Sequence, residues 1–373
     1  MRILWLTWKD VEHPLAGGAE TISSEICRRL VRDGHQVIVV TSAHGSGSRS
    51  PETTAIDGYQ VVRVGNRFSV YWRAYRYVSG HLSGWPDAVV EEINTIPFFS
   101  RYYMRRTPRV LLFYMLCREI WFYQLPLPFS LVGYLLEPLY LRLLNRDPTI
   151  ALSQSTKQDL VRHRFRADRV SVMTAAIKLT PAHDLSASEK YDRPTIVSLG
   201  HIRPMKRTLD QIRAFELARA ELPDLQLKVA GDAAGAYGRR VLRAIARSRY
   251  RADIEYLGRI SETTKRELLR RSHLIVVSSI KEGWGLIVTE AASQGTPAVV
   301  YDVDGLRDSV RNRETGVITA ANPRGMAAGI LEVLGDRRFY ERLRQQAWEW
   351  SAELTMERAY GDVAERLRSV VTR

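Results

Sequence analysis

Short apolar runs alternate with segments of helical periodicity along this chain, and its two halves begin in the same way. The first half opens with an apolar run over 3–7, a glycine-containing loop, and a stretch over 21–32 whose apolar residues recur at helical spacing. The second half opens with an apolar run over 195–199 and a glycine-started loop over 200–207 that leads into another helix. Such strand–loop–helix units predict an α/β fold, with parallel sheets covered by helices on both faces.

The length of the chain supports two domains of this type. A chain of 373 residues is too long for one ordinary core and suits two domains of roughly 180 residues each. The stretch 179–193, with Pro181 inside it and Pro194 directly after it, is polar, as a linker would be. We therefore expect one domain over residues 1–185, a second over 186–345, and a C-terminal helical segment over 346–373.

The segment 281–290 carries the strongest chemical signal, and it follows the buried apolar run 274–277. Two glycines bracket a tryptophan in it, and a helical pattern then starts. Backbone N–H groups at such a helix start can hold hydroxyl or phosphate oxygens. Glu282 and Glu290 can each accept a hydrogen bond from a sugar or ribose hydroxyl, because ionised carboxylates only accept. The alternative is a plain helix with one glutamate near its start and one on its surface.

The residues after this segment extend the pattern. A Gly-Thr-Pro turn over 295–297 ends the helix, a strand follows at 298–301, and the stretch 302–310 predicts a further helix. These features resemble the family 4 glycosyltransferases, which carry Glu, seven residues and Glu (the EX7E motif), then a Gly-Thr-Pro turn and a Gly-Leu-Arg-Asp-like loop. The resemblance covers nearly the whole sequence and is strongest over 195–334.

This resemblance implies the GT-B fold of retaining glycosyltransferases. Two facing Rossmann-like domains would bind the acceptor with the first and the nucleotide sugar with the second, and a C-terminal helix would cross back to the first domain. Glu282 would hold donor sugar hydroxyls, Glu290 the ribose, and the segment around Ile260 would meet the nucleotide base. The sugar would also meet three backbone amides, those of Gly285, Leu286 and Ile287.

The loop 200–207 is basic and precedes a helix N-terminus, which suits a pyrophosphate. In the family this loop reads Gly-Arg, a few residues, then Lys, and both cations bind the leaving diphosphate. Lys206 matches the lysine, whereas His201 stands at the arginine position, so Arg203 is the candidate to supply the missing guanidinium. The alternative is a solvated basic loop.

The first half carries two further candidates. Gly17 and Gly18 resemble the family's first glycine loop, which lies against the donor diphosphate and needs close backbone approach. This pair is not the spaced three-glycine fingerprint of dinucleotide-binding proteins, so a dehydrogenase is disfavoured, and a tight turn is the alternative. Tyr114 stands where many members carry a histidine that faces the sugar. A tyrosine can bind a hydroxyl but cannot carry the imidazolium charge.

Composition narrows the partners and the compartment. The formal net charge of +14 predicts phosphate-rich partners or an anionic membrane surface. Nucleic acid is excluded because the chain has no zinc-ligand spacing, RNP-like segment or basic repeat. Two cysteines offer neither a disulfide framework nor a metal cluster, and the N-terminus reads as a strand rather than a signal peptide. We expect a cytoplasmic protein that needs neither a metal nor a cofactor besides its sugar donor.

The stretch 98–146 has a composition of its own. It interleaves aromatic residues with arginines, and 17 uncharged residues separate Glu119 from Glu137. That run is shorter than the roughly 20 residues that span a bilayer, and prolines interrupt it, so a transmembrane helix is rejected. Two interpretations remain: peripheral contact with an anionic membrane face, or an apolar core helix with its packing loops.

Together these features predict a metal-independent, retaining hexosyltransferase of cell-envelope, glycolipid or polysaccharide biosynthesis. It would move a sugar from a UDP- or GDP-sugar to a glycan or lipid-linked acceptor, with Glu282, Lys206 and Arg203 as catalytic residues. The substitutions at His201 and Tyr114 keep two alternatives open. These are a nucleotide-sugar-binding protein with little or no transferase activity, and a nucleotide-sugar epimerase of the same fold.

Overall fold

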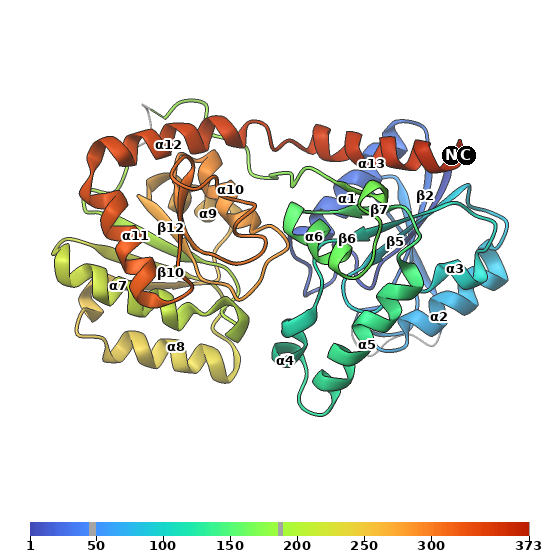
Figure 1. Cartoon of the computed structure of the whole chain (residues 1–373), viewed down its shortest axis with the longest axis horizontal. Helices are drawn as coiled ribbons and strands as arrows, with labels where there is room; N and C mark the ends of the chain where they lie inside the picture. The colour runs from blue at the N-terminus through green and yellow to red at the C-terminus, as the bar shows by residue number, and fades with distance from the viewer. Residues whose placement is uncertain (45–49, 186–188, 373) are drawn as a thin grey trace. The chain divides into compact units, whose positions relative to one another are not determined.

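A computed structural model describes residues 1–44, 50–185 and 189–372 of the chain, which form two compact units (Figure 1). Unit 1 comprises Met1–Ala176 and Thr355–Arg373, and unit 2 comprises Ile177–Leu354. Residues 177–185 belong to unit 2 because they contact its last helix and the residues that follow it: the Ile177 amide donates to the Leu354 carbonyl (3.0 Å). The Trp348 indole N–H donates to the Ala182 carbonyl (2.9 Å). The boundary between the two units therefore lies before the stretch 179–193, which was expected to be the linker.

Unit 1 is built on an eight-stranded sheet of order β3-β4-β2-β1-β5-β6-β7-β8. All neighbouring pairs are parallel except the edge pair β3–β4, which is antiparallel. The central strands are buried on both faces, which explains their continuous apolar sequences. The strands are β1 (Arg2–Leu6), β2 (Gln36–Thr41), β3 (Glu52–Ile56), β4 (Tyr59–Arg63), β5 (Ala88–Ile93), β6 (Arg109–Phe113), β7 (Thr149–Ala151) and β8 (Val170–Val172).

Helices cover this sheet, and the last helix of the chain is one of them. Helix α13 contacts α1, β5 and β6, and the Arg29–Glu357 ion pair joins α1 to α13. The predicted return of a C-terminal helix to the first domain is confirmed (Figure 1). The helices of unit 1 are α1 (Gly18–Arg32), α2 (Val70–Tyr77), η1 (Val78–Leu82), α3 (Ser100–Tyr103), η2 (Arg118–Ile120), α4 (Trp121–Gln124), α5 (Phe129–Leu144), α6 (Gln154–Arg162), η3 (Ala167–Arg169) and α13 (Met356–Val371).

Unit 2 holds a six-stranded parallel sheet of order β11-β10-β9-β12-β13-β14. Counted from its first strand this is the order 3-2-1-4-5-6 of the Rossmann fold. The strands are β9 (Thr195–Leu199), β10 (Gln226–Ala230), β11 (Ile254–Gly258), β12 (Leu274–Val277), β13 (Ala298–Tyr301) and β14 (Gly316–Thr319). The helices are η4 (Pro204–Lys206), α7 (Thr208–Glu221), α8 (Gly235–Arg247), η5 (Arg251–Asp253), α9 (Glu262–Arg271), α10 (Leu286–Ser293), α11 (Pro323–Gly335) and α12 (Arg337–Ser351).

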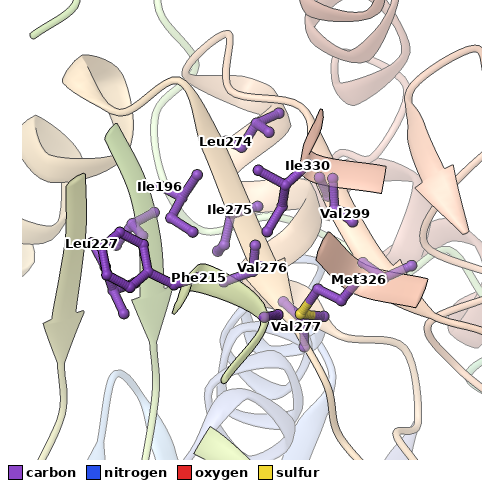
Figure 2. Close-up of a cluster of buried hydrophobic side chains, with 14 of the residues drawn as sticks. Ile196, Phe215, Leu227, Leu274, Ile275, Val276, Val277, Val299, Met326 and Ile330 are labelled. Carbon is purple, nitrogen blue, oxygen red and sulfur yellow. The ribbon is translucent and has the colours of Figure 1, made fainter. Parts of the chain in front are cut away.

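The core of unit 2 lies between its sheet and its helices. Figure 2 shows Ile275 and Val299, on adjacent strands, beside Ile330 of α11. Phe215 of α7 packs in the same cluster, and each of these four side chains is fully buried. Burial of large side chains on this scale is the main stabilising term of the unit.

Two sequence predictions differ from the structure. The stretch 302–310 forms a turn over 304–308 rather than a helix, because Gly305 has φ +81° and packs against the backbone of Glu282. The C-terminal helical segment expected over 346–373 holds the end of one helix and the whole of a second. Helix α12 ends at Ser351, and Thr355 caps α13 by accepting a hydrogen bond from the Arg358 amide (3.3 Å).

Candidate functional site

Glycines line the carboxyl edge of the unit 2 sheet. Gly200, Gly231 and Gly258 stand at the ends of β9, β10 and β11, and all three have positive φ. The Gly231 amide donates to the Gly258 carbonyl (2.8 Å). A Cβ on Gly231 would lie 2.0 Å from the Gly200 oxygen, so only glycine fits there. The ends of β9, β10 and β11 therefore present backbone without side chains, at the edge where ligands of parallel α/β sheets usually bind.

The basic loop 200–207 is fixed to the loop that follows β12. The Ile280 amide donates to the Met205 carbonyl (2.9 Å), and the Ser278 hydroxyl lies within reach of the Lys206 and Arg207 carbonyls (2.9 and 3.0 Å). The structure thus brings two predicted residues together, because Lys206 Nζ forms an ion pair with Glu282 Oε1.

The Glu282 carboxylate has a second partner that sequence reasoning missed. The Ser279 hydroxyl donates to Glu282 Oε1 (2.6 Å). The backbone of Glu282 is held as well, since its amide donates to the Asp304 carbonyl (3.0 Å). A Cβ at Gly305 would lie 2.2 Å from the Glu282 carbonyl oxygen, so the turn over 304–308 fits closely around the glutamate. This arrangement fixes a cation and a carboxylate beside the glycine edge.

The other basic-loop candidates, His201 and Arg203, are exposed. Partial burial lowers the pKa of His201, and the positive charges of Arg203 and Lys206 lower it further. His201 is therefore neutral at pH 7, and it cannot replace the charge of the arginine that the family carries at this position.

Glu290 lies on α10 and is mostly buried. Lys265 of α9 contacts both of its carboxylate oxygens (3.1 and 3.2 Å) and also pairs with Glu262 (2.8 Å). Burial raises the pKa of Glu290, and Lys265 opposes that rise. Lys265 is therefore a further candidate residue, one that the sequence analysis did not single out.

The three predicted backbone amides lie where α10 begins. Gly285 precedes the helix with φ +92°, and Leu286 and Ile287 are its first two residues. Amides in the first turn of a helix have no acceptor within the helix, so they can bind oxygen atoms of a ligand. Ile260 directly precedes Ser261, whose hydroxyl accepts a hydrogen bond from the Thr264 amide (3.1 Å) and caps α9.

In unit 1 the predicted glycines begin α1. Gly17 precedes the helix, and its amide donates to Glu20 Oε2 (2.7 Å). Lys9 in turn pairs with Glu20 Oε1 (3.1 Å). A Cβ on Gly17 would meet its nearest atom at 3.6 Å, an ordinary contact. Packing within the unit therefore does not require glycine at this position.

Tyr114 is buried behind that helix start. Its hydroxyl donates to the Ala19 carbonyl (3.0 Å) and lies 2.7 Å from the Ser23 hydroxyl, which donates to Glu92 (2.8 Å). Burial, reinforced by Glu20, raises the pKa of Glu92 to about 7. In this conformation the Tyr114 hydroxyl supports the first turn of α1. Ser23 and Glu92 gave no signal in the sequence, because both lie in ordinary helix and strand patterns.

Two absences concern the described residues alone. Within residues 1–44, 50–185 and 189–372, no three His, Cys, Asp or Glu side chains lie together as a metal site would require. In the same part of the chain no helix has the length and apolar character needed to cross a membrane.

Two α/β units, one of which holds a basic loop and paired carboxylates at a glycine-lined sheet edge, define the GT-B class of nucleotide-sugar proteins. The family model described as Glycosyltransferase Family 4 matches residues 16–180. That described as Glycosyl transferases group 1 matches residues 184–350. This chain belongs to the family 4 glycosyltransferases, which are retaining and do not need metal ions.

Individual relatives are distant. A D-inositol 3-phosphate glycosyltransferase from Jonesia denitrificans is 27% identical over 207 residues, which cover 54% of this chain and 45% of that protein. The chain spans about half the length of the curated relatives it matches. Sucrose-phosphate synthase from Thermosynechococcus elongatus superposes with a TM-score of 0.79 at 18% identity, over 100% of this chain and 99% of that one. HepE from Anabaena, in complex with UDP-glucose, gives 0.71 at 16% identity, over 99% and 100%. These likenesses show the fold.

Proposed function

We propose that this protein is a retaining hexosyltransferase that transfers a sugar from a nucleotide diphosphate sugar to an acceptor hydroxyl. The observation that carries the proposal is the Lys206–Glu282 pair, fixed by Ser279 beside the glycines that end β9, β10 and β11. A lysine at that position suits a diphosphate, and a carboxylate next to it suits a sugar hydroxyl.

UDP is the favoured donor nucleotide, with GDP as the alternative. Two proteins of similar fold are described in complex with UDP-glucose and with UDP-2-fluoro glucose. Glu290 would accept hydrogen bonds from the ribose hydroxyls, and the attraction of Lys265 favours its charged form. The Ile260 segment would meet the base.

The chemistry follows from where negative charge develops. The bond between the anomeric carbon and the donor diphosphate breaks, and the diphosphate departs with extra negative charge that Lys206 and Arg203 would stabilise. The acceptor oxygen bonds to the anomeric carbon on the face that the diphosphate leaves, so configuration is retained. The acceptor proton passes to the departing diphosphate.

The ion pair implies an exchange of partners on donor binding. When a diphosphate approaches, Lys206 can turn from Glu282 to the phosphate oxygens, because the pair is only partly buried. Glu282 keeps its bond from Ser279 and gains a free lone pair for a sugar hydroxyl. Binding of the donor thus prepares the carboxylate that positions the sugar.

A nucleotide-sugar-binding protein without turnover is the second candidate. It is favoured by one observation: neutral His201 stands where the family carries a guanidinium, which leaves fewer cations for the leaving group. The acceptor class we propose is a lipid-linked sugar or glycan at the cytoplasmic face of a membrane, where the enzyme would bind peripherally.

A thermal-shift panel with UDP, GDP, ADP and their sugar conjugates tests the donor site. A ligand that binds only the folded state raises the melting midpoint. At a ligand concentration of a hundred times its Kd, the free energy of unfolding rises by about 2.7 kcal/mol. We expect UDP-sugars to stabilise the wild type and to lose that effect in Glu290→Ala. Lys265 keeps Glu262 as a partner in this variant, so the fold should survive. Glu314→Ala, an exposed glutamate of the same unit, is the matched control. Equal shifts in all three proteins would refute the ribose assignment.

Transfer of label from a UDP-sugar to extracted membrane lipids separates the two candidate functions. Donor binding without any labelled product or donor breakdown would favour the binding protein.

A further inference from the structure

The outward face of α5 is apolar. Six of its side chains point to solvent at spacings that follow the helical repeat. Leu135, at 59%, is the most exposed of the set, which comprises Leu131, Val132, Leu135, Leu136, Leu139 and Leu143. Surface helices normally place polar residues on this side. The interpretation of α5 as an ordinary core helix therefore does not account for its exposed face.

The apolar face continues over the end of the helix into α4. Leu127 and Phe129, at the turn between the two helices, are 71% and 65% exposed, and Phe122 and Tyr123 of α4 are also exposed. Ten large apolar side chains are thus exposed over 122–143. Soluble monomers rarely expose contiguous apolar patches larger than a few hundred Å². Figure 1 shows α4 and the start of α5 projecting beyond the sheet of their unit.

This helical hairpin is held in place rather than loosely attached. The buried carboxylate of Glu137 accepts hydrogen bonds from the Cys117 amide (2.8 Å), the Arg118 amide (2.7 Å) and the Trp121 indole (3.0 Å). The Trp121 ring packs against Gly133, where a Cβ would lie 2.6 Å from it. The exposed leucines are therefore presented by a fixed scaffold.

Arginines lie where the apolar face ends. Between Arg118 and Arg142 the acidic residues are Glu119 and the buried Glu137, whereas Arg142 and Arg146 are exposed. Asp147 then lines a hollow of about 1000 Å³ that holds seven arginines and two aspartates. Arg105 and Arg106 are exposed members of this hollow. An apolar face that leads into such a cationic region matches the layers of an anionic bilayer surface.

We propose that α4 and α5 lie in the interfacial layer of an anionic bilayer, with the leucines towards the acyl chains and the neighbouring arginines on lipid phosphates. The ten apolar side chains supply binding energy, and the arginines make it depend on anionic lipid. A second copy of the chain would cover the leucines equally well. In such a dimer, however, the arginines of one copy would face the arginines of the other, and these like charges repel. An anionic bilayer is therefore the favoured occupant.

The position of the hairpin suits delivery of a lipid-linked acceptor, a role that rests on the proposed transferase function. The hairpin leaves the sheet after β6 at the carboxyl edge, where the β1–α1 connection carries Gly17 and Gly18. Tyr114, just after β6, is hydrogen-bonded to α1. The hairpin thus begins at the same edge as Gly17 and Gly18, whereas the arginine hollow lies before β6, β7 and β8, at the amino edge. An acceptor sugar on a lipid held by the start of the hairpin would be near the carboxyl edge.

Vesicle co-sedimentation tests the apolar face. Full-length protein is mixed at low salt with vesicles of equal parts phosphatidylglycerol and phosphatidylcholine. We expect wild type to sediment with them and Leu135→Gln/Leu139→Gln to partition about tenfold less, because less apolar surface enters the interface. Val161→Gln/Val172→Gln, exposed valines elsewhere in the same unit, are the matched control and should bind as wild type does.

A second pair of variants tests the charges. Arg142→Gln/Arg146→Gln should lower binding to the anionic vesicles roughly tenfold or more. Arg337→Gln/Arg338→Gln on α12, which are equally exposed, should leave binding unchanged. Raising the salt concentration should weaken wild-type binding, and vesicles of phosphatidylcholine alone should bind more weakly than mixed ones.

Three readouts separate failure of this proposal from failure of the transferase assignment. Wild type that ignores anionic vesicles overturns the bilayer proposal. Wild type that sediments as a dimer, with a monomeric leucine variant and no vesicle binding, assigns the face to a second copy instead. UDP-sugar stabilisation measured without vesicles reports on the donor site alone. It should be the same in the leucine variant as in wild type, and its loss from both would refute the donor site while leaving vesicle binding intact.

Discussion

Glu92 is a buried acid of unit 1 whose charge depends on pH near neutrality. Its carboxylate is fully buried and accepts hydrogen bonds from Trp5 (3.0 Å), Ser23 (2.8 Å) and Asn94 (3.1 Å). Burial raises its pKa to about 7 from an ordinary value of 4.5. Because the folded state holds this proton more tightly, its stabilising contribution is complete below pH 4.5 and is lost as the pH rises through 7.

Glu92→Gln should remove this dependence. We expect the variant to gain stability relative to wild type between pH 5 and pH 8, by at most about 3 kcal/mol. Melting temperatures measured across that range check the prediction. Glu119→Gln, an exposed glutamate of the same unit, is the control and should follow the wild-type profile. Parallel curves for Glu92→Gln and wild type would contradict the assignment.

The sequence indicated individual candidate residues but not the partners that hold them. Glu282 and Lys206 were predicted from separate motifs, and the structure joins them. Ser279 and Lys265 were missed as partners because a serine after a strand and a lysine in a helix are common patterns. Hydrogen bonds between residues far apart in sequence depend on side-chain direction, which periodicity does not encode. The placement of Tyr114 under α1 was unpredictable for the same reason.

At the scale of elements, the contact between α4 and α5 depends on one glycine. Alanine normally favours a helix over glycine by about 1 kcal/mol. At Gly133 a Cβ would lie 2.6 Å from the buried Trp121 ring, so the two helices would have to separate. We expect Gly133→Ala to lower the melting temperature. Gly361→Ala in α13, where nothing lies within 4 Å of the Cβ, should raise it slightly. The melting temperatures of both variants test this prediction. A Gly133→Ala variant that melts above wild type would disprove the packing argument.

The uninterrupted apolar run of β12 predicted a strand, and the glycine-started loop before α7 predicted the start of a helix. The stretch 302–310 was predicted to be a helix because Leu306 and Val310 have helical spacing. The positive φ of Gly305 produces a turn there instead. The break between α12 and α13 was missed because charged helical residues continue on both sides of 352–355.

At the scale of the molecule, the units have separate cores. Leu367 of α13 is buried in unit 1, and Leu343 of α12 is buried in unit 2. Truncation of either to alanine should cost about 2–5 kcal/mol. By calorimetry we expect two unfolding transitions. Leu367→Ala should lower the midpoint of the unit 1 transition, and Leu343→Ala that of the unit 2 transition. UDP should raise the midpoint of the unit 2 transition alone. A single transition lowered equally by both variants would show that the units unfold together.

The division of the chain also has a consequence for its synthesis. Unit 2 is continuous, and its ends meet at the bond between Ile177 and Leu354 (3.0 Å), so it can fold on the ribosome as soon as it emerges. Unit 1 must wait for residues 355–373. At about 5–20 residues per second, translation of 177–354 takes roughly 10–35 s. Throughout that time the surface later covered by Val363 and Leu367 is open to chaperones, so the part of the chain that is made first is the last to be completed.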